Sequence, residues 1–218
     1  MAPVYPLAGK GVGWVESGME GNTSPMDAIT LLKNDHKTLE KLFKQFEKAE
    51  KADDDDTKVK VVTQIIQELS VHAAIEEQVF YPAVREAVPE TEDIVLEGLE
   101  EHHIAKWTLS ELEGMTPDQE RFDAKVTVLI ESVRHHLEEE EDELFPEVRK
   151  ALGRKRLGEI GEKLAQVKET ASARPQPEAP DTPPGNLTTN KAAPKKAATK
   201  KAAPKRAAPK RAASKIKA

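Results

Sequence analysis

Two stretches of the chain are near-copies of each other, and each pairs a histidine with a glutamate four residues later. The first copy covers residues 72–82 and the second covers residues 136–146. In both copies a second glutamate follows the first, and an aromatic residue and a proline stand at the same offsets. Residues four apart lie one above the other on a helix, so each copy can direct an imidazole nitrogen and a carboxylate oxygen toward one point. Two such helices facing each other predict a metal site inside a helical bundle.

Apolar residues that recur every three or four positions predict four long amphipathic helices joined by short loops. Ser24-Pro25 reads as the capped start of the first helix, and Thr116-Pro117 with Gln119 reads as the capped start of the fourth. The second helix is expected to run unbroken over about residues 57–88. Strand signals are nearly absent, which favours an all-α, up-down-up-down four-helix bundle with a short fifth helix.

Composition divides the chain into five parts. They are an irregular N-terminal arm (1–23), the bundle (24–152), a short helix (153–170), a Pro-rich linker (171–190) and a disordered basic tail (191–218).

Six acidic or histidine side chains fall on the apolar stripes of the four long helices. His102 and His136 continue their stripes, whereas their neighbours His103 and His135 do not. A single histidine on an apolar face is most often a core residue, but a buried carboxylate is costly unless it is paired or bound to a metal. The candidate ligands are therefore His36, His72, Glu76, His102, His136 and Glu140, and Glu77, His103, His135 and Glu141 are candidates for support behind the ligands or for solvent exposure.

The donor types narrow the choice of metal. The chain has no cysteine, which excludes thiolate sites and disulfides. Imidazole and carboxylate donors in this number suit iron better than a closed four-ligand zinc site, and two metals bridged by carboxylates would use the set best. Ferritin-like bundles place glutamate before histidine, as Glu-x-x-His. The reverse order here indicates a different bundle family.

At these positions the sequence resembles the hemerythrin-like HHE cation-binding domain family, over about residues 26–150. The resemblance implies a non-haem di-iron centre that binds dioxygen at an open iron position. It implies two iron ions, oxo- or hydroxo-bridged and joined by the carboxylates of Glu76 and Glu140, with the four stripe histidines as terminal ligands. The residues that carry the resemblance are Asp35-His36, His72-x-x-x-Glu76-Glu77, Glu101-His102-His103 and His136-x-x-x-Glu140-Glu141 followed by Phe145-Pro146.

One position departs from the family pattern. Oxygen-carrying hemerythrins place a second histidine four residues after the ligand of the third helix, and here that position is Lys106. The set is a histidine short unless His103 or another group turns in. We therefore expect a protein that binds or senses dioxygen, peroxide or iron, rather than an enzyme. The alternatives are a di-iron enzyme with peroxide-decomposing or ferroxidase activity, and a metal-free, nucleic-acid-associated helical bundle.

The end of the chain has a different chemistry from the rest. Residues 191–218 hold eleven Lys or Arg and no acid, whereas residues 1–190 hold the other 22 basic and all 39 acidic residues, a formal charge of −17. The tail resembles the Lys/Ala/Pro-rich tails of linker-histone-like proteins. It can bind DNA or RNA without sequence preference, or act only as a solubilising tail. The candidate phosphate contacts are Lys195, Lys196, Lys200, Lys201, Lys205, Arg206, Lys210 and Arg211.

Membrane and export signals are weak. No apolar run approaches the length of a membrane span, and residues 1–21 lack the charged and apolar regions of a secretory signal. We expect a cytoplasmic protein without a membrane partner, associated with the nucleoid if the tail binds nucleic acid. The sequence leaves the oligomeric state open.

Overall fold

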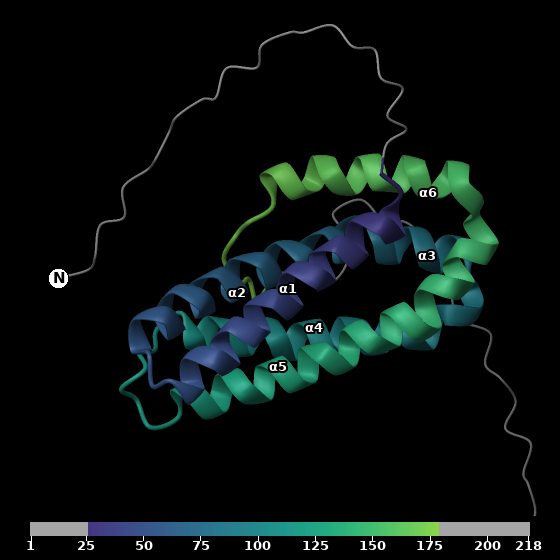
Figure 1. Cartoon of the computed structure of the whole chain (residues 1–218). Coiled ribbons are helices and arrows are strands. Elements are labelled where there is room, and N and C mark those ends of the chain that lie inside the picture. The colour runs from purple at the N-terminus through teal and green to yellow at the C-terminus, as the bar shows by residue number, and fades with distance from the viewer. Residues whose placement is uncertain (1–25, 179–218) are drawn as a thin grey trace, which may run out of the picture. The chain divides into compact units, whose positions relative to one another are not determined.

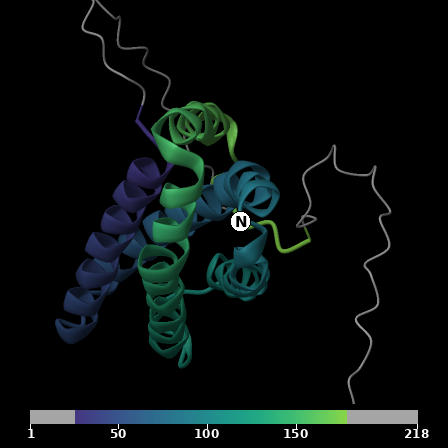
Figure 2. The same ribbon diagram turned by 90° about the vertical axis from the view of Figure 1, so that its right-hand side faces the viewer.

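The computed structural model describes residues 26–178, and every regular element in that range is helical. An all-α bundle of four long helices with a further helix is confirmed. Figure 1 shows the arrangement, and Figure 2 shows it turned by 90°. The long helices are α1 (Ala28–Lys51), α2 (Asp55–Ile75), α4 (Glu92–Leu112) and α5 (Phe122–Glu139), and α6 (Phe145–Thr170) follows them. The shorter elements are η1 (Glu76–Phe80), α3 (Tyr81–Ala87), η2 (Pro89–Thr91) and η3 (Glu140–Leu144).

The helix starts differ from the sequence prediction at two places. The cap of α1 is Asp27, whose carboxylate accepts a hydrogen bond from the Thr30 backbone N–H at 3.1 Å. The proposed cap Ser24 lies outside the described residues. The fourth helix begins at Phe122 rather than near Thr116. The side chain of Gln119 accepts from the Thr116 N–H at 3.2 Å, which closes a separate turn ahead of the helix.

Each copy of the repeated motif contains a five-residue π-helical turn, which the sequence pattern did not predict. The Tyr81 N–H donates to the Glu76 carbonyl, and the Phe145 N–H donates to the Glu140 carbonyl, five residues back in both cases. The expected unbroken helix over 57–88 is therefore wrong, because η1 interrupts it. Such wide turns are rare and concentrate at functional sites. The duplicated sequence thus folds into a duplicated local distortion that begins at each glutamate of the centre.

Two apolar clusters lie on either side of a polar layer that crosses the bundle. Along α1, Leu32 belongs to one cluster and Leu39 to the other, and His36 lies between them. The same order holds on α5 and η3, where Leu137 and Leu144 belong to different clusters on either side of Glu140. Large aromatic side chains such as Phe43 and Phe145 fill the clusters. Close-packed apolar walls therefore isolate the polar layer from water.

Helix α6 bends at Gly153, whose backbone has φ 67° and ψ 174°. A positive φ is accessible to glycine at little cost, so the helix can break and resume there. Leu157, Ile160 and Leu164 of the second half are buried in the core. That half runs back along α1 and α2 (Figure 1). None of the helices in residues 26–178 is long and apolar enough to cross a membrane.

Candidate metal centre

All six predicted ligands are buried and meet in the polar layer. The ligand atoms of His36, His72, Glu76 and Glu140 lie within 4.8 Å of one another. Those of Glu76, His102 and His136 form a second such group. Because Glu76 belongs to both, the two groups describe adjacent cation positions that share a carboxylate.

Each glutamate faces imidazoles from two different helices. The Oε2 atom of Glu76 lies 3.2 Å from Nε2 of His72 and 3.4 Å from Nε2 of His102. The Oε2 atom of Glu140 lies 3.4 Å from Nε2 of His36 and 3.8 Å from Nε2 of His136. The Nε2 atoms of His102 and His136 are themselves 3.1 Å apart. All four imidazoles therefore point the same ring nitrogen toward one centre.

The centre contains buried polar atoms that no described group satisfies. They are Nε2 of His36 and of His72, both carboxylate oxygens of Glu76, and Oε2 of Glu140. An unpaired buried polar atom costs about 1–3 kcal/mol, and a charged one more. A pair of cations bound between these atoms would remove that cost. The side chains therefore fit two metal ions, and nitrogen with carboxylate oxygen is a donor set suited to iron.

The other ring nitrogen of each histidine faces a carboxylate from a different helix. Such partners fix the tautomer and orientation of a metal-binding imidazole. The Nδ1 atoms of His36, His102, His136 and His72 lie 2.9, 3.1, 2.8 and 3.9 Å from carboxylate oxygens of Glu141, Glu77, Glu101 and Asp35, respectively.

Sequence reasoning proposed Glu77 and Glu141 as supporting residues and assigned no such role to Asp35 or Glu101. Each of the latter two precedes a candidate ligand in the chain, and that adjacency was the available signal. Adjacency does not identify the partner, however. Asp35 faces His72 of α2 rather than His36, and Glu101 faces His136 of α5 rather than His102.

Three of these carboxylates form ion pairs with lysines. Lys33 Nζ lies 2.9 Å from Glu141, and Lys106 Nζ lies 2.9 Å from Glu77. Lys168 of α6 forms an ion pair with Asp35. The lysine partners hold charge on the outer carboxylates, and they extend the interaction network from the centre to α6.

Tyr81 completes the environment of Glu140. Its hydroxyl donates a hydrogen bond to Glu140 Oε1 at 2.9 Å. Burial, and then the charge of Glu140, raises the pKa of Tyr81 well above its usual value, so the phenol stays a donor. Gly98 leaves room for this contact, because a Cβ there would lie 3.1 Å from the Tyr81 hydroxyl.

The neighbouring histidines do not reach the centre. His103 is exposed on α4, so it does not turn in to fill the place of the missing histidine. His135 is exposed on α5 and lies 3.3 Å from Glu139, one turn further along. Among the four residues proposed for support, only Glu77 and Glu141 contact the centre's histidines.

Burial decides the protonation of the centre without metal. It lowers the pKa of His72 to about 4, so this imidazole is neutral near pH 7 and ready to act as a ligand. Burial, followed by the charge of Glu140, raises the pKa of Glu76 well above its ordinary value. Burial acts in the same direction on Glu140, but the charge of His136 and the hydrogen bond with His36 outweigh it and lower its pKa. The glutamate pair therefore holds a proton on Glu76 that a metal must displace.

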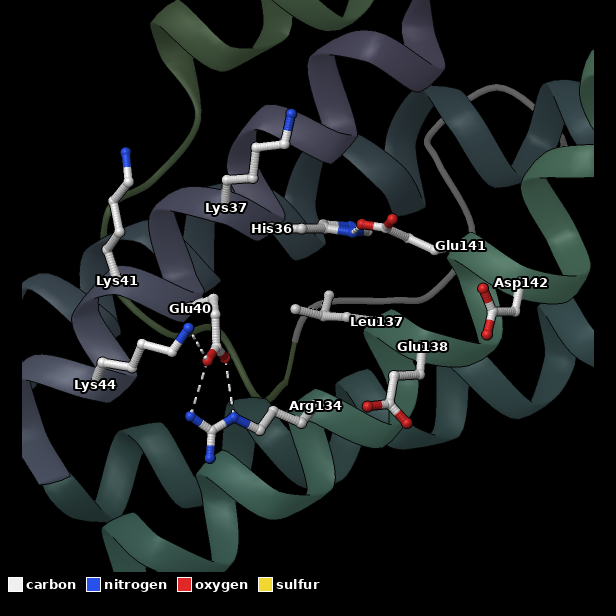
Figure 3. A pocket seen from close by; sticks show the side chains of 10 residues that line it. All are labelled: His36, Lys37, Glu40, Lys41, Lys44, Arg134, Leu137, Glu138, Glu141 and Asp142. Carbon is white, nitrogen blue, oxygen red and sulfur yellow. Dashed lines mark hydrogen bonds and ion pairs between the residues drawn. The ribbon is translucent and has the colours of Figure 1, made fainter.

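A groove of about 580 Å³ connects one side of the centre with the surface. It runs between α1 on one side and α5 with η3 on the other, and Figure 3 shows His36 and Glu141 pointing toward each other inside it. Arg134 forms one wall and is held by Glu40, with Nε and Oε2 2.9 Å apart. Solvent therefore comes close to His36 through Glu141, whose side chain is 34% exposed.

Comparison with known proteins places this arrangement in a family. The model of the hemerythrin HHE cation binding domain family matches residues 27–148. A hemerythrin-like protein of Schizosaccharomyces pombe is 27% identical over 145 residues, which are 66% of this chain and 71% of that protein. A solved structure of a hemerythrin HHE cation binding domain-containing protein from Mycobacterium kansasii is similar in fold, with a TM-score of 0.57 and 22% identity over 66% of this chain and 86% of that one. The chain therefore belongs to the hemerythrin HHE cation-binding domain family.

Proposed function

We propose that the protein binds two iron ions in the polar layer and uses them to bind or sense a small oxygen-derived ligand, dioxygen or peroxide. The observation that carries the proposal is the placement of two buried glutamates, each between imidazoles of two helices, with their facing atoms unpartnered. A cation-binding family and a donor set of imidazole and carboxylate support the same conclusion.

The protein's own residues would divide the work in layers. His36, His72, His102 and His136 would supply nitrogen donors, and Glu76 and Glu140 would bridge. Bound iron would supply redox chemistry and positions for an external ligand. The outer carboxylates would hold the imidazole tautomers, because an Nδ1–H that donates to a carboxylate leaves Nε2 free to bind metal. The apolar clusters would keep bulk water from the layer.

A spectroscopic titration tests this function. Protein loaded anaerobically with ferrous iron is exposed to air, and separately to peroxide, while the ultraviolet and visible spectrum is recorded. We expect new absorption with either ligand and its absence in Glu76→Ala. An iron-loaded protein whose spectrum changes with neither ligand would contradict the ligand-binding part of the proposal, and iron itself would then be the sensed species.

An enzyme is the second candidate function, and the groove beside His36 favours it. A solvent-connected channel of this size admits peroxide or ferrous iron repeatedly, as turnover requires. Peroxide decomposition would be measured by oxygen release, and ferroxidase activity by the rate of ferric iron formation. Turnover that is lost in Glu76→Ala would support the enzyme, and an inert iron-loaded protein would exclude it.

The basic tail adds a proposal that rests on composition alone, because residues 191–218 lie outside the described range. Eleven Lys or Arg without an acid could tether the centre to nucleic acid. The expected affinity is independent of sequence and falls steeply with salt. Loss of binding after removal of residues 191–218 tests the proposal, and an unchanged melting temperature on chelation would favour the metal-free alternative.

A further inference from the structure

A second small space lies beside the centre, between α2, α4 and α5. Its volume is about 20 Å³, which is room for roughly one water-sized molecule. Aliphatic side chains from all three helices, including Leu69, Leu109 and Val133, form most of its wall. His102 and His136 border it on the side of the centre, and Lys106 also lines it. The space therefore combines an apolar wall with two candidate ligands and a cationic side chain.

Lys106 occupies the α4 position one turn after His102. It is 5% exposed, and its Nζ lies 2.9 and 3.0 Å from the two carboxylate oxygens of Glu77. Glu77 also faces Nδ1 of His102 at 3.1 Å. The ion pair thus fixes the lysine at the edge of the space, and it fixes the imidazole that would bind metal there.

The charges around this space favour an anion. A cation held by Glu76, His102 and His136 would place positive charge on one side, and Lys106 places positive charge at the edge. In a water-poor environment such charges act strongly on a ligand, because little solvent screens them. A neutral diatomic molecule would gain nothing from the lysine. A monoanion would gain from both.

We propose that Lys106 makes this space a binding site for a small monoanion of up to about three heavy atoms, of the azide or hydroperoxide type. The inference rests on the proposed function, since the anion binds next to the metal position of His102 and His136. It goes further by assigning the class of ligand to a residue: Lys106 selects charge.

A positioning role is the competing explanation, because Lys106 could act only by holding Glu77 behind His102. The chain offers a matched control. Lys33 holds Glu141 behind His36 in the same way, at 2.9 Å, but it does not line this space. Lys106→Met and Lys33→Met each remove one such ion pair, and only the first removes a charge from the space.

The test uses the full chain, reconstituted with iron and compared at equal iron content. Azide is titrated into the ferric protein and followed by its charge-transfer absorption, and nitric oxide is titrated into the ferrous protein as a neutral probe. We expect azide affinity to fall about tenfold or more in Lys106→Met, the effect of roughly 1.4 kcal/mol. It should stay near the wild-type value in Lys33→Met and in Lys106→Arg, and nitric oxide affinity should not change.

Three results would overturn the inference. They are a wild-type protein that binds iron but not azide, an azide affinity unchanged in Lys106→Met, and a parallel loss of azide and nitric oxide binding. The last would assign Lys106 to positioning alone. If Lys106→Met does not fold, Lys106→Gln takes its place, with Lys106→Arg as the charge-retaining partner. Failure to bind iron at all would instead refute the proposed function, so the two failures are distinguishable.

Discussion

Lys168 of α6 and Asp35 of α1 form an ion pair across 133 residues of chain. Asp35 turns its other carboxylate oxygen toward Nδ1 of His72, at 3.9 Å. Residue 168 lies beyond the segment that matches the family, which ends at residue 148. The second half of α6 therefore supports a ligand of the centre from outside the matched domain.

Removal of this ion pair should weaken metal binding. In Lys168→Met the Asp35 carboxylate loses its counter-ion and no longer holds the imidazole of His72 in one orientation. Changes to such supporting partners typically reduce metal affinity about 10–100-fold. Competition with a chelator of known affinity measures the effect. Lys163→Met, on an exposed position of the same helix, should leave the affinity unchanged, and equal affinities in the two variants would refute the role of Lys168.

Two glycines of α6 should respond oppositely to alanine. A Cβ at Gly161 would lie 2.1 Å from the Met26 carbonyl oxygen and 2.9 Å from the Ala28 nitrogen, so α6 must move away from the start of α1. We expect Gly161→Ala to destabilise the fold by about 1–3 kcal/mol. At Gly158 no described atom lies within 4 Å, and alanine should stabilise the helix by about 0.5–1 kcal/mol. Urea unfolding of both variants measures the difference, and a similar free energy of unfolding in both would contradict the close approach.

The adjacent histidines provide a direct test of the ligand set. His102→Ala and His136→Ala remove donors from the buried layer, whereas His103→Ala and His135→Ala change exposed side chains. We expect iron content to fall by about half or more in the first two and to stay at the wild-type level in the others. Elemental analysis of the four purified variants decides. Iron loss in His103→Ala with retention in His102→Ala would reverse the assignment on α4.

Metal loading should release protons near pH 7. Burial and the charge of Glu140 raise the pKa of Glu76. Burial lowers the pKa of His136, but the charge of Glu140 and the contact with Glu101 outweigh it and raise the pKa overall. Both groups bind protons more tightly than usual in the metal-free protein, so metal competes with protons and affinity falls as pH falls.

Calorimetric titration in buffers of different ionisation enthalpy counts the released protons. Glu101→Gln is the matched variant, because it removes the carboxylate 2.8 Å from Nδ1 of His136 and lowers the pKa of that imidazole. We expect fewer protons released in this variant than in the wild type. Binding that exchanges no protons in the wild type would show that the centre is already deprotonated.

Helical periodicity was enough to predict the bundle, because the apolar stripes determine which faces of the helices are buried. It also selected His102 over His103 and His136 over His135, and the structure buries the selected members. The stripe spacing assumed 3.6 residues per turn throughout, so it could not predict the π-helical turns at Glu76 and Glu140. There the backbone departs from that period.

Contacts between distant segments were beyond a reading of single helices. Asp35 and Glu101 stand next to candidate ligands in the sequence but support histidines on other helices. Lys106 reads as a missing histidine, and only the packing of α2 against α4 shows its ion pair with Glu77. The role of Lys168 likewise depends on the bend at Gly153, which directs the second half of α6 back toward α1.

The metal content of the full chain after anaerobic reconstitution with ferrous iron tests the central claim most directly. The account predicts about two iron ions per chain. It also predicts that Glu138→Gln, at an exposed position beside the groove, keeps both and that Glu76→Ala loses most of the iron. A protein that binds no iron, or a single zinc ion in place of an iron pair, would contradict it.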